Sequence, residues 1–338
     1  MEMVVGNSIR DVNEGEWNAF VGTDHVDRLH AWFRTIEDSG IRKMRYIFAR
    51  DRRLTAAVCC QVYKQTLHHL EIPFLEVRSP LAKLPAFFSK SPEHAEGLLR
   101  GIKQIQTEEK TKGFLILNLE KEEFNTLRRQ MKGFQGFQMF GNTYIDLNFA
   151  DFDDYLNSLS RKDRGNIRNT MNKARKRWNI KSVVTNEFSR WKKVASTLQR
   201  YTCERHDDYR WYLTEQFYEE LEKNMKDAAE LLLFFKDDIP LASGLVLNSP
   251  TICQCRAAGI DPRYREYQAY FLMYYEQMKR AIERNQHRIY LGATTYSFKR
   301  RIGSKREELF GFVHLKNPVL DLGLKSYITF SSLWGRKF

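Results

Sequence analysis

The chain has 338 residues, 42% of them hydrophobic and 29% charged, and its 55 lysines and arginines against 42 aspartates and glutamates give a formal net charge of +13. This composition describes a globular protein with room for two domains, and it excludes a membrane-spanning chain because no segment approaches the roughly 20 apolar residues that a span requires. The positive charge favours a polyanionic partner or an anionic substrate, such as nucleic acid, phospholipid head groups, nucleotide-sugar lipids or coenzyme A.

The cysteines, the histidines and the amino terminus each exclude a class of protein. Residues 1–6 show neither the basic nor the apolar part of a signal peptide, so we expect a cytoplasmic protein. The five cysteines show no C-x-x-C spacing, which argues against a disulfide framework and predicts buried thiols. His68-His69 lies in a strand-like segment and the other histidines are scattered, so no zinc site is expected.

Residues 9–150 alternate short apolar segments, typical of strands, with helical stretches. The predicted strands are 44–50, 54–63, 74–77 and 114–119. The predicted helices are 28–37 and 92–110, and the second opens with a possible cap, Ser91, followed by Pro92 at the first helical position. The pattern is that of an α/β domain.

A similar order recurs after residue 151. The predicted helices are 152–178, 187–205, 214–226 and 268–285, and the predicted strands are 230–236, 240–248, 251–259 and 288–292. Turn residues at 237–240 and 248–250 predict hairpins between the three consecutive strands.

This recurrence predicts two copies of one α/β unit with mixed sheets. We place the domains at 1–150 and 151–338, with the boundary near 146–151. Because no Gly/Ser-rich or Pro-rich linker separates them, we expect the domains to pack around a central cleft, which would be the default binding site.

The segment 152–178 combines an apolar helical face with a basic stripe. The apolar positions are Leu156, Leu159, Ile167, Met171, Ala174 and Trp178. Four arginines three, four and seven residues apart form the stripe: Arg161, Arg164, Arg168 and Arg175. Residues 161–177 hold eight basic side chains and one acidic side chain, so the stripe repels itself unless an anion lies nearby.

Two interpretations of the stripe stay open. It is a solvated helix face, or it is an electrostatic track for RNA phosphates or for a donor's pyrophosphate, with which arginine makes bidentate contacts. A nucleic-acid-binding module would look similar, although interleaved aromatic residues for base stacking are missing.

Lys299 is the first candidate for chemistry. It follows the apolar run 288–291 and the turn 292–295, a place from which a side chain can reach an open cleft. Phe298 would supply an apolar wall, which strengthens the attraction of a cation for an anion. We expect the Lys299 ammonium to hold a phosphate or to stabilise an acyl-transfer oxyanion. The alternative is a surface lysine in a basic stretch.

A third cluster lies in residues 200–211. Arg205 and Tyr209 are four residues apart, so they would share a helical face and bind the phosphate and sugar of an acceptor, unless they form a polar helix end. His206 is a candidate general base because histidine side chains ordinarily exchange protons near neutral pH. Motifs for covalent catalysis are missing, and direct attack by an amine would need only positioning, a route for the proton and oxyanion stabilisation.

The order and spacing of the motifs resemble the FemABX-like branch of the GNAT acyltransferase superfamily. Its late Y-x-F-K-x-x-[FI]-G motif is matched by Tyr296, Phe298, Lys299, Ile302 and Gly303. Its basic R-x-x-I-R-type helix is matched by Arg164, Asn166, Ile167, Arg168, Lys173 and Ala174.

The resemblance implies two fused GNAT-like domains that transfer an acyl or aminoacyl group to an amine. It implies that Phe298 and Lys299 border the reaction centre, that Tyr296, Arg205 and Tyr209 bind the acceptor, and that the arginine stripe guides the donor. No permanently bound cofactor is implied. The partners that the resemblance implies are an amine-bearing acceptor, with or without phosphate, and tRNA, with no stable membrane insertion.

Departures from the family narrow the choice of donor and acceptor. Segment 263–269 lacks the glycines with which acetyl-CoA-dependent GNAT domains cradle pyrophosphate, and Arg300-Arg301-Ile302-Gly303 matches that loop only partly and in the wrong place. This favours aminoacyl-tRNA, with acyl-CoA second. Segment 117–121 lacks an R-x-D-P-like acid and there is no coiled-coil arm, which argues against UDP-MurNAc-pentapeptide or lipid II as acceptor. The remaining alternatives are an acetyl-CoA-dependent N-acetyltransferase acting on a metabolite or antibiotic amine, and a non-catalytic RNA-binding protein.

Overall fold

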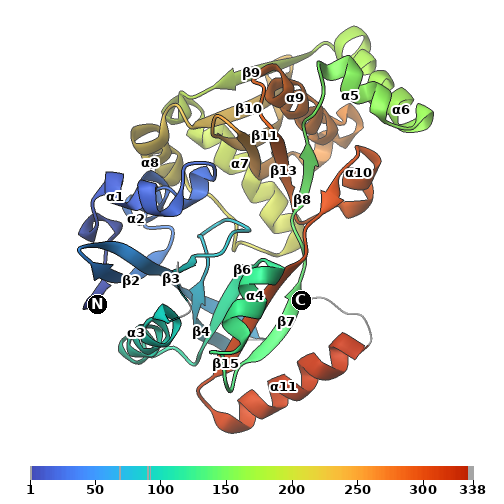
Figure 1. The fold of residues 1–338 in the computed structure, drawn as a ribbon. Coiled ribbons are helices and arrows are strands. Elements are labelled where there is room, and N and C mark those ends of the chain that lie inside the picture. The colour runs from blue at the N-terminus through green and yellow to red at the C-terminus, as the bar shows by residue number, and fades with distance from the viewer. Residues whose placement is uncertain (1, 68–69, 90, 92, 334–338) are drawn as a thin grey trace. The chain divides into compact units, whose positions relative to one another are not determined.

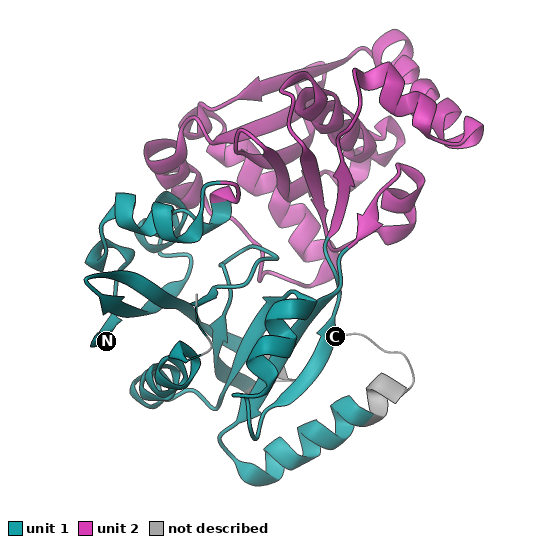
Figure 2. Cartoon of the chain, in the orientation of Figure 1, with its two compact units in different colours: residues 1–23, 27–142, 307–338 teal, residues 24–26, 143–306 magenta. Residues whose placement is uncertain are grey.

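A computed structural model of the chain describes residues 2–67, 70–89, 91 and 93–333. His68, His69 and Pro92, which entered the expectations above, lie outside the described residues. The structure is mixed α/β and contains two mixed sheets, so the predicted fold class is confirmed. Its two compact units, coloured separately in Figure 2, are residues 1–23, 27–142 and 307–338 (unit 1) and residues 24–26 and 143–306 (unit 2).

Unit 1 is built on an eight-stranded sheet in the order β1-β2-β3-β4-β6-β15-β7, with β5 paired to β3 (Figure 1). The strands are β1 Glu2–Gly6, β2 Lys43–Asp51, β3 Arg53–Leu67, β4 Leu70–Val77, β5 Phe87–Ser89, β6 Gly113–Leu119, β7 Gln135–Met139 and β15 Leu309–Leu315. The helices are α1 Glu14–Val21, α2 His30–Asp38, α3 His94–Glu108, α4 Lys121–Arg128 and α11 Pro318–Leu333. Strands β4 and β6 run parallel, and α3 packs its Leu98 and Ile102 into the main core of this sheet.

Unit 2 is built on a seven-stranded sheet in the order β14-β8-β13-β12-β11-β10-β9. The strands are β8 Thr143–Asp146, β9 Ile180–Thr185, β10 Ala229–Lys236, β11 Ile239–Asn248, β12 Ile252–Ile260, β13 Arg288–Gly292 and β14 Lys305–Arg306. The helices are α5 Phe152–Ser158, α6 Arg161–Asn172, α7 Phe188–His206, α8 Glu215–Met225, α9 Ala269–Glu283 and α10 Tyr296–Arg301. Strands β12 and β13 run parallel, and α9 packs into the core of this sheet.

The chain enters the unit 2 sheet at β8 and returns to the unit 1 sheet at β15. β15, which follows unit 2 in the sequence, lies between β6 and β7 of unit 1, and β8, which follows β7, lies between β13 and β14 of unit 2. The expected division at residue 150 therefore differs from the compact units at both places. Hydrophobic periodicity reports which segments are strands and does not report which distant strand each one pairs with.

Most long elements lie where the sequence predicts them. The predicted strands 44–50, 54–63, 114–119 and 288–292 and the helices 187–205, 214–226 and 268–285 each have a counterpart within a few residues. Elements without a prediction include the short helices α1, α4 and α10, the strands β1, β7, β9 and β15, and helix α11. No helix in the described part of the chain is long and apolar enough to cross a membrane.

The predicted single helix 152–178 is instead two helices and a final π-helical turn, 173–177. Asp151 and Ser160 each accept a backbone N–H three residues ahead, Asp154 at 2.8 Å and Asp163 at 3.1 Å, and so each begins a helix. Their apolar positions still point one way, because Leu156 and Ile167 are buried in the same core. The break occurs at Leu159, between the two helices.

Four of the five cysteines are buried, as predicted, and all five are free thiols. Cys255 is partly buried. Burial raises the pKa of the Cys59 thiol well above its ordinary value, and it raises the pKa of Cys203 to about 11. These thiols are protonated at neutral pH and act as small apolar side chains.

Candidate active site

The centre of the unit 2 sheet opens between two parallel strands. β12 and β13 pair only over Ile252–Gln254 and Arg288–Tyr290, whereas β12 continues its pairing with β11 as far as Ile260. The β11–β12 register shifts at Arg256, which makes a bulge at the point where β13 leaves. A bulge bends and twists a strand and is common beside active sites. Beyond Gln254, the β13-facing edge of β12 therefore has no strand partner in the described sheet.

Helix α10 follows β13 and projects Lys299 toward this opening. Nζ of Lys299 lies 3.6 Å from where a β-carbon on Gly292 would stand and 5.6 Å from the centre of the Tyr274 ring. Gly292 has φ of +83°, a conformation that a residue with a side chain rarely adopts, and it is the last residue of β13. The expectation of a lysine after this strand is met, but Lys299 is on a short helix.

Lys299 is fully buried, with 0% of its surface exposed. Its Nζ makes no hydrogen bond with any described residue, so the alternative of a surface lysine is wrong. Burial lowers the pKa of the ammonium to about 8, with a smaller opposing effect of Cys255. A buried cation that makes no hydrogen bond is costly, and such groups concentrate at functional sites.

Aromatic side chains surround α10. Phe298 is buried against Phe271 of α9, with ring centres 4.7 Å apart, and lies 5.5 Å from the Tyr274 ring that also faces Lys299. Tyr296, at the first position of α10, is half-buried, and the Arg306 guanidinium lies over its ring. The expected apolar wall beside Lys299 is therefore present, and Tyr274 completes it.

The backbone is strained where α10 begins. Thr295 is β-branched yet has φ of +51°, and its hydroxyl lies 3.0 Å from that of Tyr270. At the other end, the Tyr155 hydroxyl donates to the carbonyl of Ile302 at 3.1 Å. Side-chain contacts from α9 and α5 thus hold both ends of this six-residue helix, which fixes the direction of Lys299.

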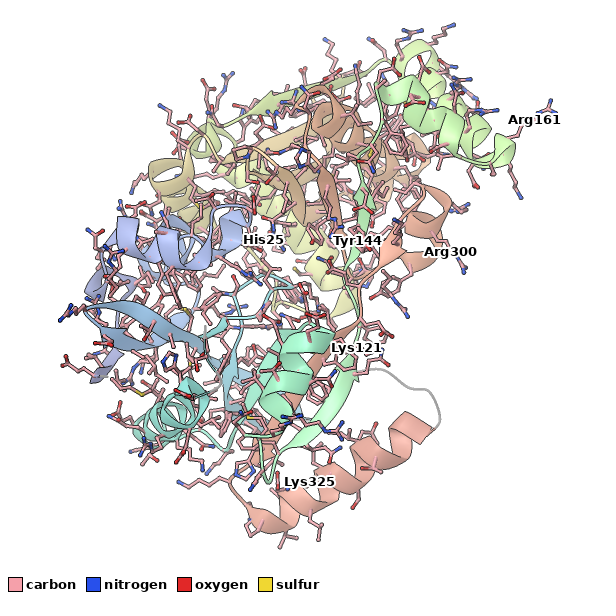
Figure 3. All side chains as sticks on the ribbon, viewed as in Figure 1. His25, Lys121, Tyr144, Arg161, Arg300 and Lys325 are labelled. Carbon is pink, nitrogen blue, oxygen red and sulfur yellow. The ribbon has the colours of Figure 1, made fainter. Side chains whose placement is uncertain are left out.

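The predicted basic stripe lies on α6 and the turn after it. Arg161, Arg168 and Arg175 are exposed and Arg164 is half-exposed, and Figure 3 labels Arg161 at the start of α6. Arg168 makes an exposed ion pair with Asp153 at 3.1 Å. The stripe therefore faces solvent and is available to an anion.

Two further arginines extend the stripe. Gly303, two residues after the end of α10, lies against Leu159, two residues before the start of α6, because a β-carbon on Gly303 would meet the Leu159 side chain at 3.2 Å. Arg300 and Arg301 on α10 are exposed, and Figure 3 labels Arg300. In the sequence, these residues form only an incomplete match to a pyrophosphate loop. In the structure, α10 places them beside the start of α6. We name Arg161, Arg164, Arg168, Arg300 and Arg301 the basic patch.

Arg205 and Tyr209 do not share a helical face, so that prediction is wrong. Helix α7 ends at His206 because Asp207 adopts a left-handed conformation with φ of +47°. Arg205 and His206 are exposed in the last turn, and Tyr209, 50% exposed, lies beyond the helix end. Their proposed roles in acceptor binding stay predictions.

The last turns of α7 nevertheless lie near the open end of β12. The Ile260 N–H donates to the Thr202 hydroxyl at 3.1 Å, and Ile260 is the last residue of β12. Arg205 is three residues further along α7. This contact places Arg205 at the same end of β12 as the opening.

Sequence reasoning missed the residues that line the Lys299 site from α9 and β12. Tyr270 and Tyr274 come from α9, and the partly buried Cys255, which donates to the Gln277 amide oxygen, comes from β12. In the sequence these residues look like ordinary members of an apolar helix and a strand. The helical spacing of Tyr270 and Tyr274 is visible in the sequence, but such spacing is typical of a buried core and does not indicate a site.

Aromatic rings pack at the turn before α9, which is where an acetyl-CoA-dependent GNAT domain holds pyrophosphate. Residues 262–267 form a short 3-10 turn, and Tyr267 packs edge-on against Trp178 with ring centres 5.8 Å apart. Tyr264 also packs on this core, and Gln268 accepts a hydrogen bond from Thr170. Bulky side chains here replace the glycines that would let a phosphate approach the backbone.

Comparisons with known proteins agree with this geometry. A family model described as FemAB-like, peptidoglycan biosynthesis/recognition, matches residues 72–332. Among solved structures, FemX aligns with 96% of this chain and 100% of its own chain, at 16% identity and a TM-score of 0.63. No match was found among curated proteins.

Two other solved structures are similar in fold. The C-terminal domain of a putative lysylphosphatidylglycerol synthetase from Agrobacterium fabrum aligns with 96% of this chain and 97% of its own, at 12% identity and a TM-score of 0.59. A tandem GNAT protein from the clavulanic acid biosynthesis pathway aligns with 94% of this chain and 99% of its own, at 8% identity and a TM-score of 0.60.

Two mixed sheets, each with one parallel strand pair, and these structural neighbours define a protein of tandem GNAT-type fold. Because the family model covers most of the chain, the chain belongs to the FemAB-like family. The resemblance inferred from the motifs is thereby confirmed. Family and fold together support an acyltransferase-type function.

Proposed function

We propose that the chain transfers an aminoacyl group from aminoacyl-tRNA to an amine, and that the reaction takes place at Lys299. The observation that carries this proposal is the fully buried Lys299 ammonium, which has no hydrogen-bond partner among the described residues and lies at the opening between β12 and β13. A preorganised cation in a low-dielectric site stabilises developing negative charge more strongly than water does.

In this mechanism the acceptor nitrogen attacks the ester carbonyl of the donor. The carbonyl oxygen becomes an oxyanion, which the Lys299 ammonium stabilises. The C–O bond to the ribose then breaks, the new C–N bond remains, and the proton lost by the amine passes to the departing ribose oxygen. Phe298 and Tyr274 exclude water from this side of Lys299.

The basic patch supports tRNA as the donor carrier. It is exposed, it extends from α6 to α10, and α10 also carries Lys299, so phosphates bound there would lie near the reaction centre. Tyr264 and Tyr267 fill the turn before α9, which argues against a pyrophosphate of coenzyme A in that turn.

For the acceptor we propose an amine-bearing component of the cell envelope that contains phosphate. The family description names peptidoglycan biosynthesis or recognition, and one neighbour is a putative lysylphosphatidylglycerol synthetase. Arg205, near the open end of β12, would bind the phosphate, and Tyr209 and Tyr296 would contact the rest of the acceptor.

The test measures transfer of a radiolabelled amino acid from charged tRNA to a set of phosphate-containing amines. Lys299→Ala should lower the transfer rate by at least a hundredfold, whereas the exposed Lys181→Ala in the same unit should leave it within twofold. No transfer by the unmodified protein, with charged tRNA still bound, would point to the RNA-binding alternative. Transfer from acetyl-CoA alone would replace the proposed donor.

A further inference from the structure

Helix α11 exposes large apolar side chains along one side. The exposed fractions are 75% for Val319, 62% for Leu320, 67% for Leu322 and 55% for Tyr327. These are four of the eight large apolar residues that are exposed in the described chain, so half of them gather on one helix. Such a cluster marks an interaction surface, whereas single exposed apolar residues do not.

The opposite side of α11 is fixed to unit 1. The Asp321 carboxylate accepts the Leu315 N–H of β15 at 2.8 Å and pairs with Lys325 at 2.6 Å, and Ile328 is 5% exposed. α11 packs against β15 and β7, which lie beside it in Figure 1. These contacts set the rotation of the helix, so its apolar side faces outward.

Negative charge is missing from the outward side. Asp321 is the one acidic residue in 318–333, and it is 7% exposed because it faces β15. Positive charge lies at the start of α11, where the exposed Lys316 precedes the helix, whereas Lys325 (Figure 3) is paired with Asp321 on the inward side. The chain as a whole carries +13.

We propose that α11 binds the surface of an anionic phospholipid bilayer. Its outward side would enter the head-group region, with Val319, Leu320 and Leu322 reaching the upper acyl chains and Tyr327 at the polar boundary. The exposed Lys316 and the net positive charge of the chain would be attracted to anionic lipid head groups. This binding needs neither Lys299 nor a donor, so it goes beyond the proposed transfer reaction.

Charge distinguishes a bilayer from a second copy of the chain. Two copies that meet along α11 would bring together two chains of +13 with no carboxylate on the meeting surfaces of the helices. An anionic bilayer supplies the complementary charge and accepts a single helix without a matching groove. The observations therefore favour the bilayer.

The experiment is co-sedimentation of the full chain with vesicles of phosphatidylcholine alone or mixed equally with phosphatidylglycerol. The test variant is Leu320→Ser with Leu322→Ser. The matched control is Val4→Ser with Ile239→Ser, which removes two exposed apolar side chains, 42% and 41% exposed, elsewhere in the chain. Circular dichroism checks that both variants fold.

We expect binding to the mixed vesicles that is at least tenfold stronger than to phosphatidylcholine alone. The α11 variant should bind the mixed vesicles at least tenfold more weakly, because serine at 320 and 322 removes the apolar area that the two leucines would bury in the lipid. The affinity of the control variant should change less than twofold. Lys299→Ala should bind like the unmodified chain, which separates this proposal from the transfer reaction.

Two results would overturn the proposal. One is vesicle binding that is absent or that is the same in the α11 variant and the unmodified chain. The other is a dimer in light scattering that the α11 substitutions convert to a monomer while vesicles bind neither form, because α11 would then be an interface between copies.

Discussion

Lys299 is the residue at which stability and function oppose each other. Its ammonium is withdrawn from water and lacks a hydrogen-bond partner among the described residues, and its contact with the Tyr274 ring offsets only part of the cost of desolvation. Selection for stability alone would place an apolar side chain there. A lysine at this place is best explained by an anion that is absent until a substrate binds.

Replacing Lys299 by methionine should stabilise the fold at neutral pH. The pKa of Lys299 falls from 10.5 to about 8 on folding, which corresponds to a penalty on the order of 3 kcal/mol when the group is charged. We therefore expect Lys299→Met to raise the free energy of unfolding at pH 7 by about 1–3 kcal/mol. Urea denaturation measures this difference.

The pKa of Lys299 also sets the direction in which the free energy of unfolding changes with pH. Between pH 8 and 10.5 the unfolded chain holds the lysine proton and the folded chain has lost it, so the stability of the unmodified protein rises with pH relative to the methionine variant. The difference between the two proteins should shrink across this window. A difference that stays constant from pH 7 to pH 10 would show that Lys299 does not titrate as described.

The pH dependence of the transfer rate should also reflect the titration of Lys299. If the ammonium stabilises the oxyanion, the rate should fall as pH rises through about 8, because Lys299 loses its proton there. Lys299→Arg should be slower, yet it should keep its remaining activity to a higher pH because arginine stays charged. Rates in saturating substrate from pH 6 to pH 10 provide the check, and an unchanged alkaline limb in the arginine variant would contradict the assignment.

At this scale the sequence singled out the lysine that the structure buries, whose role stays a prediction, and missed its surroundings. Lys299 and Phe298 stand in a motif with recognisable spacing, so they were found. Tyr274 and Cys255 carry no local signal because their role depends on how α9 and β12 pack. The Arg205–Tyr209 prediction failed at one residue, Asp207, whose left-handed backbone ends the helix.

Among the elements, α6 and α10 decide how the donor would be held. The double substitution Arg164→Ala with Arg168→Ala should weaken tRNA binding and reduce the slope of log K against log salt, by about 0.7–0.9 for each lost phosphate contact. Filter binding at several salt concentrations measures both quantities.

The control for this experiment is an exposed arginine pair in unit 1. Arg128→Ala with Arg129→Ala removes the same charge from the end of α4. If this pair changes the affinity and the salt slope as much as the α6 pair does, net charge and not the basic patch holds the RNA.

Hydrophobic periodicity predicted long elements more successfully than short ones. Long helices such as α7 and α9 repeat their apolar positions over several turns, so periodicity identified them. Helix α10 has six residues, fewer than two turns, and offered no such repeat. The run 152–178 kept one apolar period across two helices, so only the caps at Asp151 and Ser160 revealed the break.

At the scale of the whole molecule, unit 1 is completed by a strand, β15, that follows unit 2 in the sequence. β15 lies between β6 and β7, so a chain cut at residue 150 leaves a gap inside the unit 1 sheet. We expect a fragment of residues 1–150 to show no cooperative unfolding transition in urea, because the core around β6 would be open to water.

The control for this experiment is a chain that contains β15. The Glu307 N–H donates to the Asn142 carbonyl at 2.9 Å, so residues 1–142 joined by a short glycine linker to residues 307–338 would contain the complete unit 1 sheet. This chain should unfold cooperatively. Cooperative unfolding of the 1–150 fragment at the same denaturant midpoint would contradict the role assigned to β15.

Such pairing lies beyond what sequence patterns reveal in a single chain. The partners β6 and β15 are separated by nearly 200 residues, and nothing in either strand's composition names the other. The α/β class and the tandem fold were predictable because they depend on element order and on motif spacing. The compact units were not, because they depend on pairing between distant strands.

Calorimetry on the purified protein tests most directly whether charged tRNA is the donor. Acetyl-CoA, charged tRNA and uncharged tRNA would each be titrated at two salt concentrations. We expect tighter binding of charged than uncharged tRNA and no saturable binding of acetyl-CoA. Saturable binding of acetyl-CoA, with RNA binding that is salt-labile and indifferent to charging, would overturn the proposed donor and identify a CoA-dependent acetyltransferase.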